Sequence, residues 1–358
     1  MNASPDRHPA QWPHIADLLP PVEKELPPGR HEFHKERLMA QIHADTKHTA
    51  RPATRTPGPK RPRGPWWRRP ALVLPLGACA LAGALAAGGT LAGGDKPPGL
   101  ATGPLLTTPV GAATAHGTGS LLRRVSLAAE QAPAPAPRPD QYIYIESVTA
   151  TTYVRTRDHR SEVVSDKPHR RRVWTSPDGH KGWLVEPGTT PKDGTTLDTD
   201  VDSVSAYAAL DALPRDPNAL LRRIYALSEG RGNSRDQAAF TTIGDLVGES
   251  YPPAGLEAAL YRAAAKIPGV VTVDDAVDAA GRHGVAVARL DETSGDREEW
   301  IFDRESHTFL GERTVHVKEA KNANAEDRLI KPGTVTFTSA VTSRTLVGGI
   351  KETPSRRS

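Results

Sequence analysis

The chain has one cysteine, Cys79, and only five phenylalanines among 358 residues, and aromatic side chains make up 5% of the sequence. A single cysteine excludes an intrachain disulfide and any cysteine-rich metal site. Any folded domain must therefore be held together by its own apolar core. The 33 prolines indicate that a substantial part of the chain lies outside helices and strands.

Motifs that carry chemistry are also missing. There is no G-x-S-x-G sequence and no Walker-type phosphate loop. The acidic run that includes Asp274, Asp275 and Asp278 lacks the ring of oxygen ligands that a calcium loop needs. Glu298 and Glu299 are adjacent, so in a strand they face opposite sides and cannot work as a carboxylate pair. We therefore expect a protein that is not an enzyme, with no catalytic, cofactor-binding or metal site.

The net charge of +4 is unevenly distributed. Basic residues exceed acidic residues in the first 70 positions, whereas acidic residues exceed basic ones after position 140. Positive charge confined to one segment suits anionic lipid headgroups better than nucleic acid. We therefore predict no nucleic-acid partner.

The stretch 71–93 contains no charged, amide or aromatic side chain. As a helix its 23 residues would extend about 34 Å, enough for a hydrocarbon layer of about 30 Å. Trp66, Trp67, Arg68 and Arg69 precede it and have the residue types of a membrane interface. The pattern predicts a single transmembrane helix in the cell membrane, with the N-terminus cytoplasmic and the C-terminal domain extracytoplasmic. Lipidation of Cys79 in the lipobox-like sequence Leu-Gly-Ala-Cys is an alternative.

Residues 1–70 are too polar and too rich in proline to form a core. This cytoplasmic basic segment is predicted to be largely disordered, with two short amphipathic helices that could dock a partner. The apolar residues of these helices are candidate partner-binding residues: Ile15, Leu18, Leu19, Phe33, Leu38, Met39 and Ile42. A mobile tail whose apolar side chains rest on lipid headgroups explains the same pattern.

Residues 94–117 are rich in Gly, Pro, Thr and Ala and predict a flexible stalk. An extracytoplasmic domain is expected over 118–350, followed by a disordered tail over 351–358. The domain opens with a helix from Ser120, continues with a long strand from Gln141, and then has a hairpin that carries Trp174 and Trp183 on its two arms.

Three helices and a meander of strands complete the predicted domain. Asp216 followed by Pro217 starts one helix, and a capping box from Ser234 to Gln237 starts the next. Short polar turns between the later strands imply antiparallel pairing. The expected fold class is α+β: one transmembrane helix plus an extracytoplasmic domain with a curved, half-barrel-like antiparallel sheet and helices on one face.

Several segments together resemble an actinobacterial family of single-pass membrane proteins of uncharacterised function. They are DLLPPVEKELPPGRHEFHKERLM, SLLRRVSLAAEQ, PDQYIYIES, DPNALLRRIYA, PAGLEAALYRAAAKIPGV, DAAGRHGVAVARLD and EWIFDRESHTFLGERTV. Members are often encoded beside extracytoplasmic-function sigma factors, so the resemblance implies an anti-sigma-like role. The chain departs from zinc-type anti-sigma domains because it lacks their Cys-x-x-Cys.

Two functions follow from the sequence. The first is a transmembrane regulator whose N-terminal segment binds a sigma factor or another cytoplasmic protein, while the outer domain senses an envelope condition. The alternative is a membrane-anchored binding module that holds a lipid or protein ligand of the envelope and has no signalling role.

Overall fold

The computed structural model describes residues 100–354 except 158–159 and 201. All of these residues belong to the second of the two units into which the chain divides, Arg61–Ser358. In chain order the helices are α2 (Thr118–Gln131), α3 (Tyr207–Asp211), α4 (Pro217–Leu227), α5 (Arg235–Glu249), α6 (Leu256–Ala264) and the 3-10 turn η2 (Asp327–Leu329). The strands are β1 (Thr102–Gly103), β2 (Ala113–Thr114), β3 (Tyr142–Arg157), β4 (Arg160–Asp166), β5 (His169–Thr175), β6 (Gly182–Val185), β7 (Thr195–Thr196), β8 (Val270–Val277), β9 (His283–Leu290), β10 (Asp296–Phe302), β11 (Phe309–His316) and β12 (Val335–Val347).

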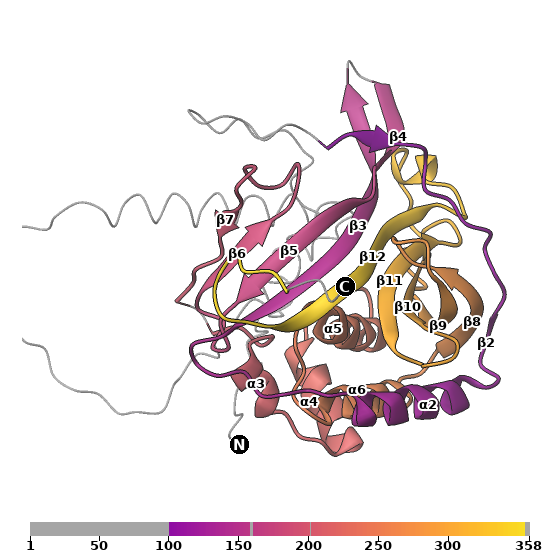
Figure 1. Cartoon of the computed structure of the whole chain (residues 1–358). Helices are drawn as coiled ribbons and strands as arrows, with labels where there is room; N and C mark the ends of the chain where they lie inside the picture. Colours follow the sequence, from indigo (N-terminus) through magenta and orange to yellow (C-terminus); the bar gives the residue numbers. More distant parts are fainter. Residues whose placement is uncertain (1–99, 158–159, 201, 355–358) are drawn as a thin grey trace, which may run out of the picture. The chain divides into compact units, whose positions relative to one another are not determined.

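All of these strands belong to one 12-stranded antiparallel sheet, and ten of them follow the order β2-β8-β9-β10-β11-β12-β3-β5-β6-β7. The other two, β1 and β4, extend the sheet from β3, whose C-terminal half pairs with β4. Strand β12 lies between β11 and β3, so it joins the later meander to the earlier strands. Figure 1 shows this sheet curving around α5.

The central helices begin where side chains cap them. The Asp216 carboxylate accepts hydrogen bonds from the backbone N–H groups of Asn218, at 3.1 Å, and Ala219, at 2.8 Å, and Pro217 occupies the first turn of α4. The Ser234 hydroxyl accepts from the N–H of Gln237 at the start of α5, at 3.1 Å. Both starts agree with the sequence prediction.

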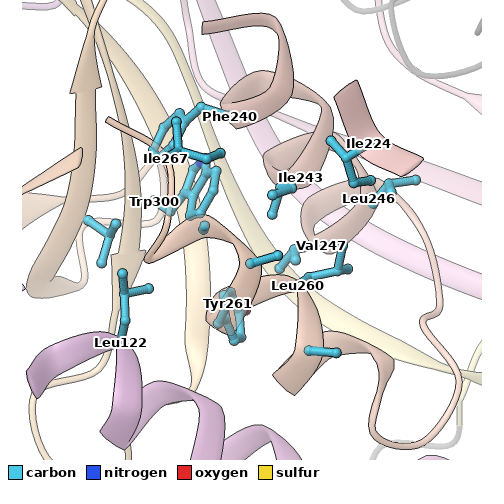
Figure 2. Close-up of a cluster of buried hydrophobic side chains, with 14 of the residues drawn as sticks. Leu122, Ile224, Phe240, Ile243, Leu246, Val247, Leu260, Tyr261, Ile267 and Trp300 are labelled. Carbon is cyan, nitrogen blue, oxygen red and sulfur yellow. The ribbon is translucent and has the colours of Figure 1, made fainter. Parts of the chain in front are cut away.

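The main core lies between the helices and one face of the sheet (Figure 2). Trp300 of β10 stacks on Phe240 of α5, with ring centroids 3.8 Å apart and planes 6° from parallel. Tyr261 of α6 meets Phe302 edge-on at 5.3 Å. Aromatic contacts between α5, α6 and β10 therefore fix the helices on this face of the sheet.

The opposite face of the same strands carries a buried ion-pair network. The Glu299 carboxylate accepts from Arg297 Nε at 2.7 Å and from Arg313 Nε at 2.8 Å, and all three side chains are buried. Arg297 Nη1 also donates to the Gly111 carbonyl at 3.0 Å, so the network holds the segment that precedes α2.

The predicted fold class is wrong. It included a transmembrane helix, whereas the described residues form mainly one large antiparallel sheet with a few short helices. None of the helices in the described ranges is both long and apolar enough to cross a bilayer. The longest, α5, has 15 residues and extends about 22 Å, which is short of a hydrocarbon layer of about 30 Å. The stretch 71–93 lies outside the described residues.

The structure also differs from the sequence interpretation at the predicted stalk. Within 94–117, β1 pairs with β4 and β2 pairs with β8. Strands of two residues are too short to leave an alternating apolar pattern, so composition alone favoured a linker.

Candidate functional site

Two adjoining hollows of about 400 Å³ and 360 Å³ lie beside α2. They share the lining residues Ala129, Ala132, Glu257 and Arg344, and together we call them the α2 groove. Both hollows are open to solvent along one side. Their combined size and half-open form suit an extended ligand rather than a fully enclosed one.

The groove exists because small residues follow a well-packed helix start. Leu121, Leu122 and Val125 of α2 are buried in the core, whereas the C-terminal end of the helix presents Ala129 and then Ala132. Methyl groups leave space that longer side chains would fill. The alanines give the groove apolar surface, and Glu257, Arg344 and Thr345 give the first hollow polar surface.

Prolines form the outer rim of the first hollow. Pro133 and Pro135 follow α2, and Pro252 and Pro253 lie in the loop between α5 and α6. The hydroxyl of Tyr251 donates to the Pro135 carbonyl at 3.2 Å, which fastens one rim to the other. Proline has no N–H donor, so these rims offer carbonyl acceptors and apolar rings to a ligand.

Arg344 of β12 is the positively charged group that lines both hollows. Its Nη2 donates to the carbonyls of Val247 and Gly248, the latter at 3.5 Å, at the C-terminal end of α5. A cation there is favourable because those carbonyls carry the negative end of the helix dipole. Its Nη1 lies 3.8 Å from Glu257 Oε2, and its Nε is buried without a partner among the described residues.

The Glu257 carboxylate also accepts from the Tyr261 hydroxyl at 2.8 Å. Burial, together with this carboxylate, raises the pKa of Tyr261 well above its usual value, so the phenol stays protonated and keeps donating. One oxygen of the Glu257 carboxylate therefore binds Tyr261, and the other lies 3.8 Å from Arg344. Tyr261 is neutral, so Glu257 keeps its negative charge beside Arg344, and the donor of this group that lacks a partner among the described residues is Arg344 Nε.

The second hollow ends at His307, whose φ of 57° is unusual for a residue with a side chain. Arg124 of α2 donates from Nε to His307 Nε2 at 2.9 Å. Positive charge from Arg124 therefore lies near this end of the groove.

A cluster of four carboxyl groups lies between α5 and the sheet. Asp245 and Glu249 come from α5, Glu298 from β10 and Glu312 from β11. Burial beneath the helix raises the pKa of every member, and the charge of Glu298 raises the pKa of Asp245 and Glu312 further.

Hydrogen bonds and nearby arginines offset the effect of burial on these pKa values, but to a different extent for each carboxyl group. Glu298 accepts from Thr241, at 2.6 Å, and Gln237, at 3.1 Å, and these bonds partly offset its burial. Glu249 lies 3.7 Å from Arg171 Nη2. Arg231 lowers the pKa of Asp245 but does not cancel the effect of burial.

This cluster predicts that the domain is more stable at mildly acidic pH than at slightly alkaline pH. A carboxyl group with a raised pKa in the folded state holds its proton more tightly there than in the unfolded chain. Its stabilisation is complete below the unfolded pKa, 4.5 for a glutamate, and is lost as the pH rises through the folded pKa. Urea unfolding at pH 5 and pH 8 measures this difference.

The variant Glu312→Gln is expected to flatten that pH dependence and to raise the free energy of unfolding at pH 8, because glutamine has no proton to lose. Glu305→Gln, at an exposed position, serves as the control and is expected to leave the slope unchanged. A Glu312→Gln slope equal to that of the wild type would contradict the prediction. His169, whose pKa is also raised, adds to the wild-type slope with the same sign.

Within the described ranges, no group of three or more His, Cys, Asp or Glu side chains is placed to hold a metal ion. The sequence-predicted site residues lie outside the described residues: partner-binding Ile15, Leu18, Leu19, Phe33, Leu38, Met39 and Ile42, and interfacial Trp66, Trp67, Arg68 and Arg69. The groove residues were not predicted, because α2, the loop between α5 and α6, and β12 meet only in the folded chain.

No protein-family model matches the chain, and no curated protein matches it. Among solved structures, the chain is similar to one described as the complex structure of Pseudomonas aeruginosa MucA/MucB. The identity is 13%, the alignment covers 67% of this chain and 59% of that chain, and the TM-score is 0.22. Neither the fold nor the function of this chain is inferred from a similarity of that size.

Proposed function

We propose that residues 100–354 form the ligand-binding domain of an anti-sigma-like regulatory protein, and that the α2 groove is its binding site. The observation that carries this proposal is the connection made by Arg344. The same guanidinium lines both hollows of the groove and donates to the carbonyls of Val247 and Gly248 in the last turn of α5. A ligand that attracts Arg344 thus acts directly on the end of a buried helix.

The groove favours an elongated ligand with an apolar body and an anionic group. Alanine and proline walls remove apolar surface from water, which drives binding without directional contacts. The anionic group is expected at Arg344, since its ion pair with Glu257 is long, at 3.8 Å, and its Nε has no partner among the described residues. A hydrogen bond to a charged partner contributes about 1.5–3 kcal/mol.

The fluorescent probe 8-anilinonaphthalene-1-sulfonate has these two properties and tests the groove. We expect the protein to bind it at one site, with fluorescence enhancement. Ala132→Trp fills the groove and is expected to abolish binding, whereas Ala226→Trp, at an exposed position on α4, is the matched control. Arg344→Lys is expected to weaken binding about tenfold, equivalent to about 1.4 kcal/mol.

Thermal unfolding of each variant separates loss of binding from loss of folding. Equal probe binding by Ala132→Trp and the wild type would show that the groove is not the binding site. Weaker binding by Ala226→Trp would show that the probe reports on exposed apolar surface in general.

The regulatory half of the proposal concerns the N-terminal segment. It rests on the amphipathic residues of 1–46 and on the family resemblance. Affinity capture with residues 1–70 is expected to recover a sigma factor or another specific protein. Deletion of residues 1–46 is expected to change transcriptional output, whereas an anchored binding module without a signalling role predicts no such change.

A further inference from the structure

The sheet face opposite α5 carries a row of aromatic side chains on neighbouring strands. Tyr144 of β3 lies opposite Trp174 of β5, and Trp174 lies opposite Trp183 of β6. Successive side chains of a strand alternate between faces, so this row, which we call the aromatic ladder, faces away from the buried Ile143 and Ile145. The rings of Tyr144 and Trp174 are 5.1 Å apart.

The C-terminal segment 348–354, which we call the strap, lies on this ladder. Ile350 packs against the cluster that contains Tyr144 and Trp174. The Lys351 ammonium is 4.0 Å from the centroid of the Trp183 ring, and the Glu352 carbonyl accepts from Trp174 Nε1 at 2.6 Å. The sequence predicted a disordered tail from residue 351, so these contacts were unexpected.

The strap is attached by few contacts. Residues 351–354 are exposed, and the strap begins with two consecutive glycines. Lys351 has a φ of 69°, a left-handed conformation that is unfavourable for a residue with a Cβ. A segment held in this way is suited to exchange with a competitor.

The strap makes a turn here, closed by the Glu352 N–H donating to the Gly349 carbonyl at 3.2 Å. We propose that the aromatic ladder is a second binding site, which takes a turn-forming segment of a partner protein with a lysine or arginine after an apolar residue. The strap occupies this site as an internal competitor. The cation of the partner stacks on Trp183, its backbone carbonyl accepts from Trp174 Nε1, and its apolar side chain replaces Ile350. The Arg172 guanidinium, 5.9 Å from the Trp174 ring centroid, disfavours a second cation there and so sets the direction of the segment.

Peptides with the strap sequence test this proposal. The probe is GGIKETP, and the control peptide, GGIEETP, carries glutamate in place of lysine. Binding is followed by NMR through the indole N–H signals of Trp174 and Trp183, with the buried Trp300 as an internal reference for folding. We expect GGIKETP to bind a chain that ends at Gly348 at least tenfold more tightly than it binds the intact chain, because tethering gives the strap an effective concentration in the mM range. GGIEETP is expected not to bind.

A second variant retains the full length of the chain. Lys351→Glu removes the cation from Trp183 and is expected to shift the indole signals of Trp183 and Trp174 and to allow GGIKETP to bind. Lys266→Glu, at an exposed position after α6, is the matched control and is expected to change neither signal. The proposal is overturned if the shortened chain keeps its Trp300 signal and fails to bind GGIKETP, or if both peptides bind equally. If the shortened chain does not fold, unchanged signals in Lys351→Glu overturn the proposal.

Discussion

Replacing Glu299 by glutamine is expected to lower the free energy of unfolding by about 3–5 kcal/mol, the usual cost of breaking a buried ion pair by removing one partner. Glu299 has 0% of its surface exposed and is the carboxylate bonded to both Arg297 and Arg313. Glutamine keeps the shape of the side chain but leaves two buried guanidinium groups without a counter-charge. Arg297 Nη2 has no partner in the described part of the chain even in the wild type, which adds to the imbalance.

Two further variants show whether the loss of stability comes from the unpaired buried charges. Glu305→Gln, an exposed substitution of the same kind, is expected to change stability by less than about 0.5 kcal/mol. Replacing Arg297, Glu299 and Arg313 together by methionine removes every charge of the network, and we expect this variant to be nearer the wild type than Glu299→Gln. Urea unfolding measures all three. A neutral effect of Glu299→Gln would mean that water reaches these charges.

Replacing Trp300 by alanine is expected to cost about 3–5 kcal/mol as well, through a different mechanism. Trp300 is fully buried, stacks on Phe240 and donates from Nε1 to Glu298 at 3.1 Å. Its removal opens a cavity between α5 and the sheet. The substitution also removes the hydrogen bond from the indole to Glu298, so this member of the carboxyl cluster has one donor fewer.

The size of this cavity depends on how far α5 can move inward. A Cβ placed on Gly244 would lie 2.5 Å from Trp300 Nε1, so α5 already lies directly on the indole ring. The same Cβ would lie 2.9 Å from Glu298 Oε1, and Trp300→Ala removes both the ring and the indole bond that holds this carboxylate in place. The Glu298 side chain can then move aside, and the double variant Gly244→Ala with Trp300→Ala is expected to recover part of the lost stability. Leu127→Ala, where the leucine is 54% exposed, is the control and should change the melting temperature little. If Trp300→Ala and Leu127→Ala lowered the melting temperature by the same amount, a core role for Trp300 would be contradicted.

Local signals in the sequence located α2, α4, α5, α6 and many of the strands, but not the short helix α3. The N-cap at Asp216, the capping box at Ser234 and the prolines before α6 act within a few residues, so they can be recognised without tertiary structure. The pairing of Trp174 with Trp183 followed from the turn between them. Each of these features depends on contacts that are close in sequence.

Features that depend on distant contacts were missed. Strand β4 was not predicted, because its two apolar residues, Val163 and Val164, are adjacent and give no alternating pattern. The α2 groove was missed because Ala132, Pro252 and Arg344 carry no joint signal until three separate segments pack together. The transmembrane helix in the predicted fold class came from one apolar run rich in alanine and glycine, which lies outside the described residues.

The position of β12 has a consequence for synthesis of the protein. Ribosomes make β12 after every other described strand, yet it lies between β3 and β11 in the sheet. While the nascent chain is tethered, the earlier and later strand groups each lack this neighbour, and β3 and β11 present unpaired backbone groups. The two strand groups can be joined into one sheet only when residue 347 has left the exit tunnel. Until then, β3 and β11 are open edges that chaperones would have to protect.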